Sequence, residues 1–202
     1  MVDDLSPEYH KALDEARAHH ASSKTYSGKF LRPHAPFILE LIQRFRAGSV
    51  LDYGCGKGAQ YTWVSHGGDA SIPEGLTIEQ YWGVPVTKYD PAYPPFATEP
   101  VGKFDLVICT HVLGSIPIAD LHVIVPRIFR YARDGVYFAE KIGEVRKQVF
   151  SEPGKFPRGW DHETWARYLT SHARNFPEVE AHLATREATP EGVKVKRVRL
   201  WP

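Results

Sequence analysis

The sequence predicts an α/β protein built on a doubly wound, mostly parallel sheet with an antiparallel C-terminal hairpin. Short apolar runs alternate with segments of helical periodicity along most of the chain, which is typical of parallel strands joined by helices. The first apolar run leads directly into a glycine-rich turn. The last two runs follow one another without a helix between them, and this arrangement favours a hairpin.

An N-terminal helix is expected over Pro7–His20, because Ser6 and Pro7 form a favourable cap and first turn. Its weakly apolar face consists of Ala12, Leu13 and Ala16. We interpret this helix either as a lid or as an appendage. Several aromatic and basic residues follow it and could close over a bound ligand, including an acidic one, or form a solvated connector: Tyr26, Lys29, Phe30, Arg32 and His34.

The core elements follow in order from residue 36. Helical spacing predicts helices over Pro36–Phe45 and Ile118–Tyr131, and a later helix that Asp161 caps and that runs to about Asn175, with an inner face of Trp165, Tyr168 and Leu169. The predicted strands are Ser49–Leu51, Val84–Tyr89, Phe104–Thr110, Gly135–Ala139, Val179–Ala184 and Val193–Trp201.

Three irregular segments interrupt this alternation. Tyr61–Trp82 is interpreted as a disrupted helix plus a loop, and Pro91–Lys103 is too short and too rich in proline for a further helix and strand. Lys141–Gly159 is the best candidate for a mobile loop over a site.

Length and composition indicate a single globular domain of 202 residues, with residues 1–34 as a helix and candidate lid and residues 35–202 as the core. The net charge of +1 gives no support for general nucleic-acid or membrane binding. The N-terminus is acidic and polar, unlike a signal peptide, so we expect a cytoplasmic location. Cys55 and Cys109 lie in buried runs without Cys-x-x-Cys spacing, which argues against a disulfide framework and a metal site. The oligomeric state stays open, with a homodimer among the alternatives.

The strongest functional signal is the segment Val50–Gly58, which has the sequence VLDYGCGKG. Its glycines let the backbone turn sharply and let a ligand approach main-chain N–H groups at a helix start, where an anionic group is favoured. The Asp52 carboxylate would repel a pyrophosphate but suits an ammonium group. An amino-acid-like ligand that carries both charges satisfies both conditions.

The VLDYGCGKG segment resembles the first motif of class I S-adenosylmethionine-dependent methyltransferases, which have a Rossmann-like fold. The resemblance implies that the methionine end of S-adenosylmethionine is held by Asp52, Tyr53, Gly54, Cys55 and Gly56. It continues at Tyr89–Ala92, where it implies that Asp90 binds the two ribose hydroxyls, with Pro91 and Ala92 beside it. Asp90 follows Asp52 by 38 positions (90 minus 52), whereas roughly 20 is usual, so extra structure is expected between them.

A third match is Phe104–Pro117, which resembles the family's fourth strand and following loop and adds Thr110, His111 and Val112 to the cofactor site. Many small-molecule members have Asp-Val-Leu-Glu-His-Ile-Pro in this loop. Here His111, Gly114 and Ser115 replace the acidic, acidic and histidine positions. Catalytic residues therefore cannot be transferred from the family by position.

His111 is nevertheless the candidate catalytic base, because an imidazole with an ordinary pKa near 6.5 suits proton uptake. The alternative is a hydrogen-bonded structural histidine. Cys55 is interpreted as a small turn residue, since no base lies near it in the sequence. The late helix begins at Trp160, Asp161 and His162. Asp161 is interpreted mainly as a cap, but such a helix start commonly faces the acceptor in proteins of this architecture, so these residues are candidates for acceptor contact.

The sequence therefore predicts an S-adenosylmethionine-dependent methyltransferase that acts on a small-molecule acceptor. Three alternatives remain. The altered loop allows a non-catalytic S-adenosylmethionine-binding protein. The pattern Gly54-x-Gly56-x-x-Ala59 also occurs in NAD-dependent oxidoreductases, although Asp52 argues against a pyrophosphate there. A nucleic-acid methyltransferase is less well supported, since Thr110–Leu113 lacks the Asn/Asp-Pro-Pro-Tyr type of signature.

Overall fold

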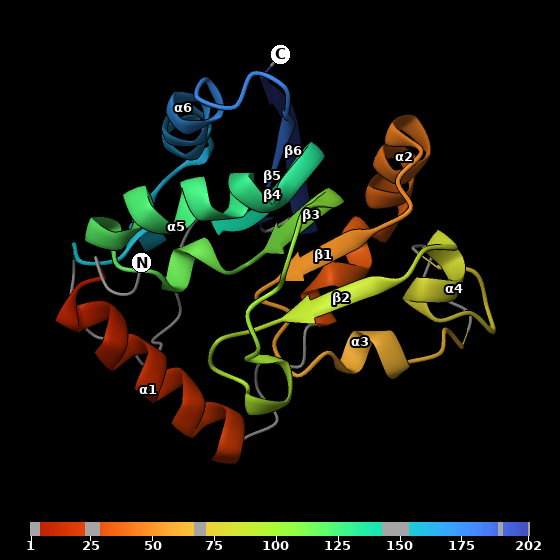
Figure 1. The fold of residues 1–202 in the computed structure, drawn as a ribbon, viewed down its shortest axis with the longest axis horizontal. Helices are drawn as coiled ribbons and strands as arrows, with labels where there is room; N and C mark the ends of the chain where they lie inside the picture. The colour runs from red at the N-terminus through yellow and green to blue at the C-terminus, as the bar shows by residue number, and fades with distance from the viewer. Residues whose placement is uncertain (1–4, 23–28, 67–71, 143–153, 190–191, 202) are drawn as a thin grey trace.

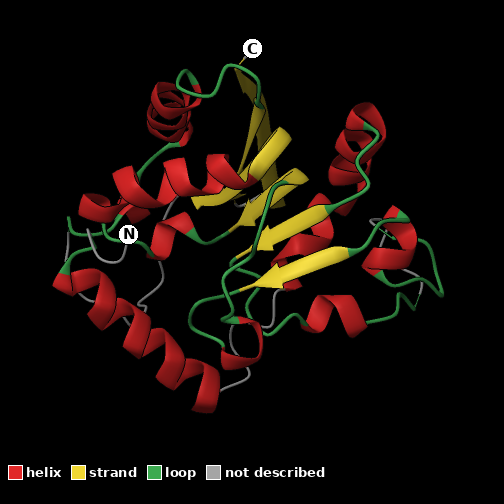
Figure 2. Ribbon diagram, viewed as in Figure 1, coloured by secondary structure: helices red, strands yellow, loops and turns green. Residues whose placement is uncertain are grey.

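A computed structural model of the chain describes residues 5–22, 29–66, 72–142, 154–189 and 192–201. Within these ranges the protein is a six-stranded sheet with helices on both faces (Figures 1 and 2). The strands are β1 (Val50–Tyr53), β2 (Val86–Tyr89), β3 (Phe104–Thr110), β4 (Ala132–Ile142), β5 (Glu180–Thr189) and β6 (Gly192–Trp201).

The sheet has the order β2-β1-β3-β4-β5-β6, and only the β5–β6 pair is antiparallel. The predicted fold class is therefore confirmed, including the C-terminal hairpin. Because β1, β2, β3 and β4 are parallel, their carboxyl ends meet at one edge of the sheet. That edge carries the glycine-rich turn after β1.

The longer helices are α1 (Pro7–Ser22), α2 (Ala35–Phe45), α5 (Ile118–Tyr131) and α6 (His162–Ala173). Shorter helical turns are α3 (Ala59–Thr62), α4 (Ile78–Trp82), η1 (Lys29–His34), η2 (Pro94–Phe96), η3 (Leu113–Ser115) and η4 (Pro157–Gly159). The predicted caps are present. Ser6 Oγ accepts a hydrogen bond from Tyr9 N at 3.1 Å, and Asp161 Oδ1 accepts one from Thr164 N at 2.8 Å.

Successive strand residues point to opposite faces and build two hydrophobic clusters. One cluster joins the sheet to α1, α5 and α6, with Phe129, Phe138 and Trp165 fully buried. The other joins it to η1, α2, α3 and α4, with Leu31, Ile38 and Tyr137 fully buried. Both faces of the sheet are therefore covered, which explains why the central strands β1 and β3 are mostly buried and apolar.

The irregular segments differ partly from expectation. Tyr61–Trp82 contains the ends of α3 and α4, with residues 67–71 outside the described ranges, and Pro91–Lys103 contains only η2. The predicted strand Gly135–Ala139 is longer at both ends, because β4 follows α5 directly and continues to Ile142 along β5. Lys141 therefore belongs to a strand and not to the predicted loop; residues 143–153 of that loop lie outside the described part.

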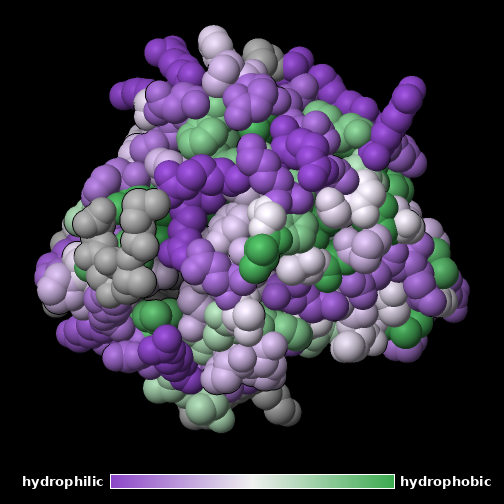
Figure 3. Space-filling view, in the orientation of Figure 1, coloured by the Kyte–Doolittle hydropathy of each residue, from purple (hydrophilic) through white to green (hydrophobic). Residues whose placement is uncertain are grey.

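The visible face of the molecule is mostly hydrophilic, with small separate hydrophobic groups (Figure 3). In the described residues no helix combines the length and apolar character needed to cross a membrane. Cys55 and Cys109 are both buried free thiols.

Candidate cofactor and acceptor site

A pocket lies where the carboxyl ends of β1, β2 and β3 meet, with a volume of about 150 Å³. Its lining includes all eleven residues predicted for cofactor binding: Asp52, Tyr53, Gly54, Cys55, Gly56, Asp90, Pro91, Ala92, Thr110, His111 and Val112. The structure thus brings together three segments that are far apart in the sequence. Their contact with a cofactor remains a prediction.

The glycine-rich turn is held against β2 by its own backbone. Gly54 N and Cys55 N donate to Tyr89 O at 2.7 and 3.1 Å, and Gly56 N donates to Asp90 Oδ2 at 2.8 Å. These three amides therefore already have hydrogen-bond acceptors within the protein. Gly54 has a φ of 86° and a Cβ there would overlap the side chain of Val112, so only glycine lets the two loops approach.

Asp52 ends β1 inside the protein, with 1% of its surface exposed. Its Oδ2 accepts hydrogen bonds from Tyr61 Oη at 2.7 Å and Gln60 Nε2 at 3.4 Å. Its Oδ1 is buried and has no hydrogen-bond partner among the described residues. Burial raises the pKa of this carboxyl to about 7, and the Tyr61 hydrogen bond opposes part of that rise. A cationic group of a ligand would give Asp52 Oδ1 the partner that it lacks among the described residues.

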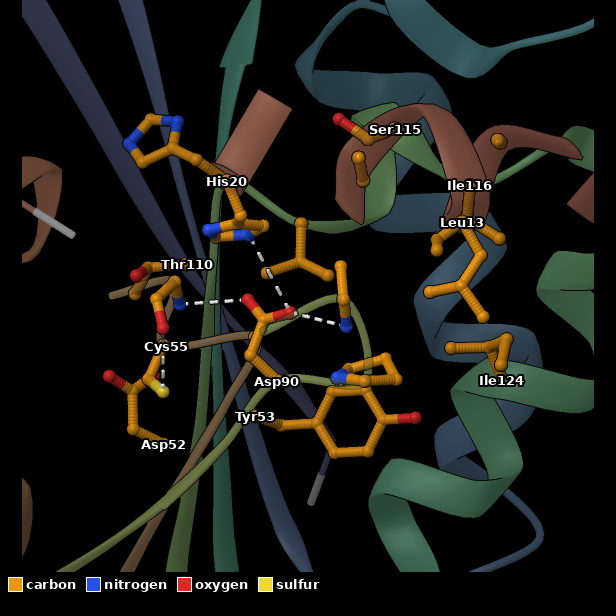
Figure 4. A pocket seen from close by; sticks show the side chains of 18 of the residues that line it. Leu13, His20, Asp52, Tyr53, Cys55, Asp90, Thr110, Ser115, Ile116 and Ile124 are labelled. Atoms are coloured by element: carbon orange, nitrogen blue, oxygen red, sulfur yellow. Dashed lines mark hydrogen bonds and ion pairs between the residues drawn. The ribbon is translucent and has the colours of Figure 1, made fainter. Parts of the chain in front are cut away.

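Asp90 stands at the centre of the pocket (Figure 4). Its two oxygens accept hydrogen bonds from Gly56 N at 2.8 Å and from Ala92 N at 2.9 Å. His20 Nε2 lies 3.9 Å from Oδ1. Each carboxylate oxygen retains a further lone pair, so the carboxylate can still accept from a pair of hydroxyl groups.

Helix α1 forms the roof of this pocket. Tyr9, Ala12, Leu13, Ala16 and His20 line the pocket from above, so the predicted apolar face contacts the site and the helix is not a separate appendage. Its start is fixed to α5, because Asp120 accepts hydrogen bonds from both the N–H and the hydroxyl of Ser6, each at 2.7 Å. Figure 1 shows α1 across the side toward which the arrowheads of β1 and β2 point.

The pocket has a polar end and an apolar end. Figure 4 shows Asp52, Cys55 and Thr110 on one side of Asp90 and Leu13, Ile116 and Ile124 on the other. Leu13 comes from α1, Ile116 follows η3, and Ile124 comes from α5.

His111 follows β3 in a left-handed conformation with a φ of 59°, which is uncommon for a residue other than glycine. Its N–H donates to Ala139 O at 2.7 Å, and its ring lies 5.3 Å from that of Phe30 and 5.7 Å from that of His34. Nε2 is buried without a partner in the described structure. Burial first, and then the charges of Arg186 and Lys141, lower the pKa of His111 to about 4. The imidazole is therefore neutral at pH 7. It is also a weaker base than expected from the sequence, because that expectation relied on an ordinary pKa near 6.5.

Glu140 is a site residue that the sequence reasoning missed. It is 3% exposed and accepts hydrogen bonds from Leu113 N at 2.9 Å and Gly114 N at 3.3 Å. Burial raises its pKa to about 8, against the effect of these backbone hydrogen bonds. It therefore holds the loop that carries His111. Its signal in the sequence was an acidic residue directly after a buried strand.

Gln60 and Tyr61 were also missed as parts of the site, and so was the partner of His34. The first two contact Asp52 from α3, and His34 Nδ1 lies 2.7 Å from Tyr137 Oη. His34 was predicted among the residues that could close over a bound ligand or form a solvated connector. The partner that gives it a role, Tyr137, is 103 positions away, so no local pattern could reveal the pair.

The other predicted contacts lie outside the pocket lining. Asp161 caps α6, His162 Nδ1 lies 2.7 Å from Thr185 Oγ1, and Trp160 packs edge to face on Trp165. Arg32 stacks over Trp63 at 3.6 Å, whereas its neighbour Phe30 does line the pocket. Tyr26 is outside the described residues. No group of His, Cys, Asp and Glu in the described part could hold a metal ion.

Comparison with known proteins gives one match. A family model described as a methyltransferase domain matches residues 26–178, which is more than half of the chain. No curated protein and no solved structure matches.

Proposed function

The chain belongs to the class I S-adenosylmethionine-dependent methyltransferases, and from this we propose that it transfers a methyl group from S-adenosylmethionine to a small-molecule acceptor in the pocket beneath α1. The observation that carries the proposal is Asp52 Oδ1, a buried carboxylate oxygen without a partner in the described residues, at the polar end of that pocket. The ammonium group of an amino-acid-like cofactor would satisfy it.

The residues present fit this cofactor. Asp52 would hold the ammonium group, and Asp90, with an acceptor lone pair left on each oxygen, would hold the ribose hydroxyls. Leu13, Ile116 and Ile124 offer apolar contact to the remainder. A dinucleotide fits less well, because its pyrophosphate would lie among two carboxylates and turn amides that already have acceptors.

S-adenosylmethionine supplies, when bound, a methyl group that its sulfonium sulfur already activates. The protein therefore has to align the acceptor and exclude water. Helix α1 and the apolar side chains under it exclude water, and the neutral His111 can accept a proton at Nε2 from an acceptor that must lose one. A thiolate or carboxylate acceptor needs no base.

A small molecule is the better acceptor than a nucleic acid for two reasons. The net charge of +1 provides no general attraction to phosphates. Helix α1 contributes Leu13 and His20 to the lining of the pocket, and this cover favours a small acceptor over a nucleotide that remains attached to a strand.

A non-catalytic binding role is the second candidate. It is favoured by the loop His111–Ser115, in which the family's acidic and histidine positions are replaced. Both candidates require cofactor binding and they differ only in product formation.

Calorimetric titration with S-adenosylmethionine, S-adenosylhomocysteine and NAD tests the cofactor assignment. The first two should bind and stabilise the protein by about 2.7 kcal/mol at a hundredfold excess over Kd. Asp90→Ala should abolish this, whereas Asp14→Ala, which changes an exposed ion pair with Arg17, should not. Stabilisation by NAD alone would overturn the proposal. Transfer of a radiolabelled methyl group to phenols, amines, thiols or carboxylic acids separates enzyme from binding protein.

A further inference from the structure

Two pairs of like-charged side chains lie near the carboxyl edge of the sheet. The acidic pair consists of Asp52, in β1, and Asp90, which directly follows β2. The basic ones, Lys141 and Arg186, lie near the ends of β4 and β5, on the other side of β3. His111 follows β3 and therefore stands between the two groups.

The strand register places Lys141 and Arg186 next to each other. Lys141 is paired with Arg186 in the β4–β5 ladder, and residues paired in this way project from the same face. That face also carries Tyr137 and Ala139 of β4, and it is the face covered by η1 and α2. His111 donates its N–H to the carbonyl of Ala139, two positions before Lys141.

Within the part of the chain that the structure describes, neither basic side chain has an acidic partner. In the described residues no carboxylate lies within ion-pair distance of Lys141 or Arg186. The nearest acids in the sequence, Glu140 and Glu187, project from the opposite face of the sheet, because successive strand residues alternate between the two faces. Two adjacent unpaired cations on one face repel each other, so a bound anion would stabilise both. Arg186 is half-buried, which strengthens its interaction with such an anion relative to a fully exposed charge.

The influence of these cations reaches the pocket. Burial is the main cause of the lowered pKa of His111, and Arg186 and Lys141 lower it further. Arg186 also contributes to lowering the pKa of the neighbouring His34 to about 3, after burial and the charges of His111 and Arg197. Phe30, which is 52% exposed and lies 5.3 Å from His111, offers an apolar surface on the same side.

We propose that Lys141 and Arg186 bind an oxyanion, a carboxylate or a phosphate, carried by the acceptor of the methyl transfer. The inference rests on the proposed function, because it names the class of acceptor for the same site. The cofactor, with its cationic end, would occupy the acidic side at β1 and β2, and the acceptor would place its anion on the basic side at β4 and β5. The guanidinium of Arg186 beside the ammonium of Lys141 suits either a carboxylate or a phosphate, because a guanidinium can bind two oxygens in one plane.

The experiment uses the full chain with ¹³C-labelled histidine and follows the His111 ring resonance, assigned with His111→Gln. Benzoate, phenyl phosphate and benzamide are titrated with and without saturating S-adenosylhomocysteine. Benzoate or phenyl phosphate should shift the resonance saturably and raise the pKa of His111, because the anion offsets the two cations. The neutral benzamide should bind at least tenfold more weakly. A larger effect of phenyl phosphate than of benzoate would indicate a phosphate rather than a carboxylate.

Matched variants locate the site. Arg186→Gln and Lys141→Gln should each weaken benzoate or phenyl phosphate binding at least tenfold, whereas Lys194→Gln, on the edge strand β6, should not. Equal affinity for benzamide, an equal loss in Lys194→Gln, or no shift with either anion would overturn the proposal. Calorimetry with S-adenosylhomocysteine on each variant keeps the two proposals apart. If S-adenosylhomocysteine binds normally but the anions are not selected over benzamide, only the oxyanion site is refuted. If the anions bind selectively but S-adenosylhomocysteine does not bind, the methyl-transfer role is refuted.

Discussion

Binding of the cofactor should release a proton from Asp52 at mildly acidic pH. Burial raises the pKa of this carboxyl from 3.8 to about 7 in the free protein. At pH 6 about nine-tenths of the molecules therefore carry a proton there. An ammonium group about 4 Å from the carboxylate, at an effective dielectric constant of about 20, contributes about 4 kcal/mol. That energy lowers a pKa by about three units, enough to return Asp52 to its ordinary range.

Calorimetry with S-adenosylhomocysteine at pH 6, in two buffers of different ionisation enthalpy, measures this release. Nearly one proton should leave per ligand bound, because the ligand's own amino group is already protonated at that pH. The affinity should fall by up to tenfold per pH unit below 7, since the protonated carboxyl must ionise before it can bind a cation. Asp52→Asn should abolish the release and flatten the pH dependence. Proton release that persists in Asp52→Asn would refute the assignment of the ammonium group to this residue.

Four further predictions test other parts of the site. His111→Ala should lower turnover by about two to four orders of magnitude with an acceptor that must lose a proton, and it should leave the Kd of S-adenosylhomocysteine nearly unchanged. Unaltered turnover would show that His111 is not the base. Because the pKa of Glu140 is about 8 in the folded protein, the folded state binds more protons than the unfolded one, so the free energy of unfolding should fall as pH rises from about 4.5 to 8. Urea titrations should show a smaller fall in Glu140→Gln. Asp120→Ala removes the hydrogen bonds that fix the start of α1, each of which contributes about 1.5–3 kcal/mol when its partner is charged. Dissociation of S-adenosylhomocysteine, measured by stopped flow, should therefore accelerate about tenfold. An unchanged rate would show that α1 does not control release. Gly54→Ala should destabilise the protein by about 1–3 kcal/mol in the same titrations, and adding Val112→Ala should recover only part of this, because a φ of 86° stays unfavourable for alanine.

The parts of the fold that could be predicted were those with a local signal. The caps at Ser6 and Asp161 and the glycine-rich turn each depend on residues a few positions apart, and the structure has all three. The length of β4 had no such signal. The polar residues Arg133 and Asp134 and then Gly135 precede its apolar run, and glycine is needed at position 135 because the ring of Phe45 packs where a Cβ would lie. That contact spans ninety positions (135 minus 45) and is invisible in any sequence window.

The same distinction applies to the site. Asp52 and Asp90 could be identified because each follows or ends a recognisable strand, and the family resemblance added their roles. The unpartnered oxygen of Asp52 could not be predicted, since it depends on tertiary packing, and the position of α1 over the pocket was predicted only as one of two alternatives, a lid or an appendage. The expectation that main-chain amides at the helix start contact a ligand stays a prediction, and the amides of Gly54, Cys55 and Gly56 have acceptors within the protein, Tyr89 O and an oxygen of Asp90.

The two halves of the site differ in how the chain fixes them, and this difference explains why the cofactor could be inferred from the sequence and the acceptor could not. The proposed cofactor half is made by the ends of β1 and β2, where one short motif sets the turn and Asp52, and Asp90 directly follows β2. The acceptor half depends on the end of β4. The carbonyl of Ala139 accepts the hydrogen bond of the His111 N–H, Glu140 accepts those of Leu113 N and Gly114 N, and Lys141 is paired with Arg186. Two consecutive strand residues, Ala139 and Glu140, thus hold a loop that is nearly thirty positions earlier in the chain. A change in this strand end should therefore alter acceptor recognition before it alters cofactor affinity.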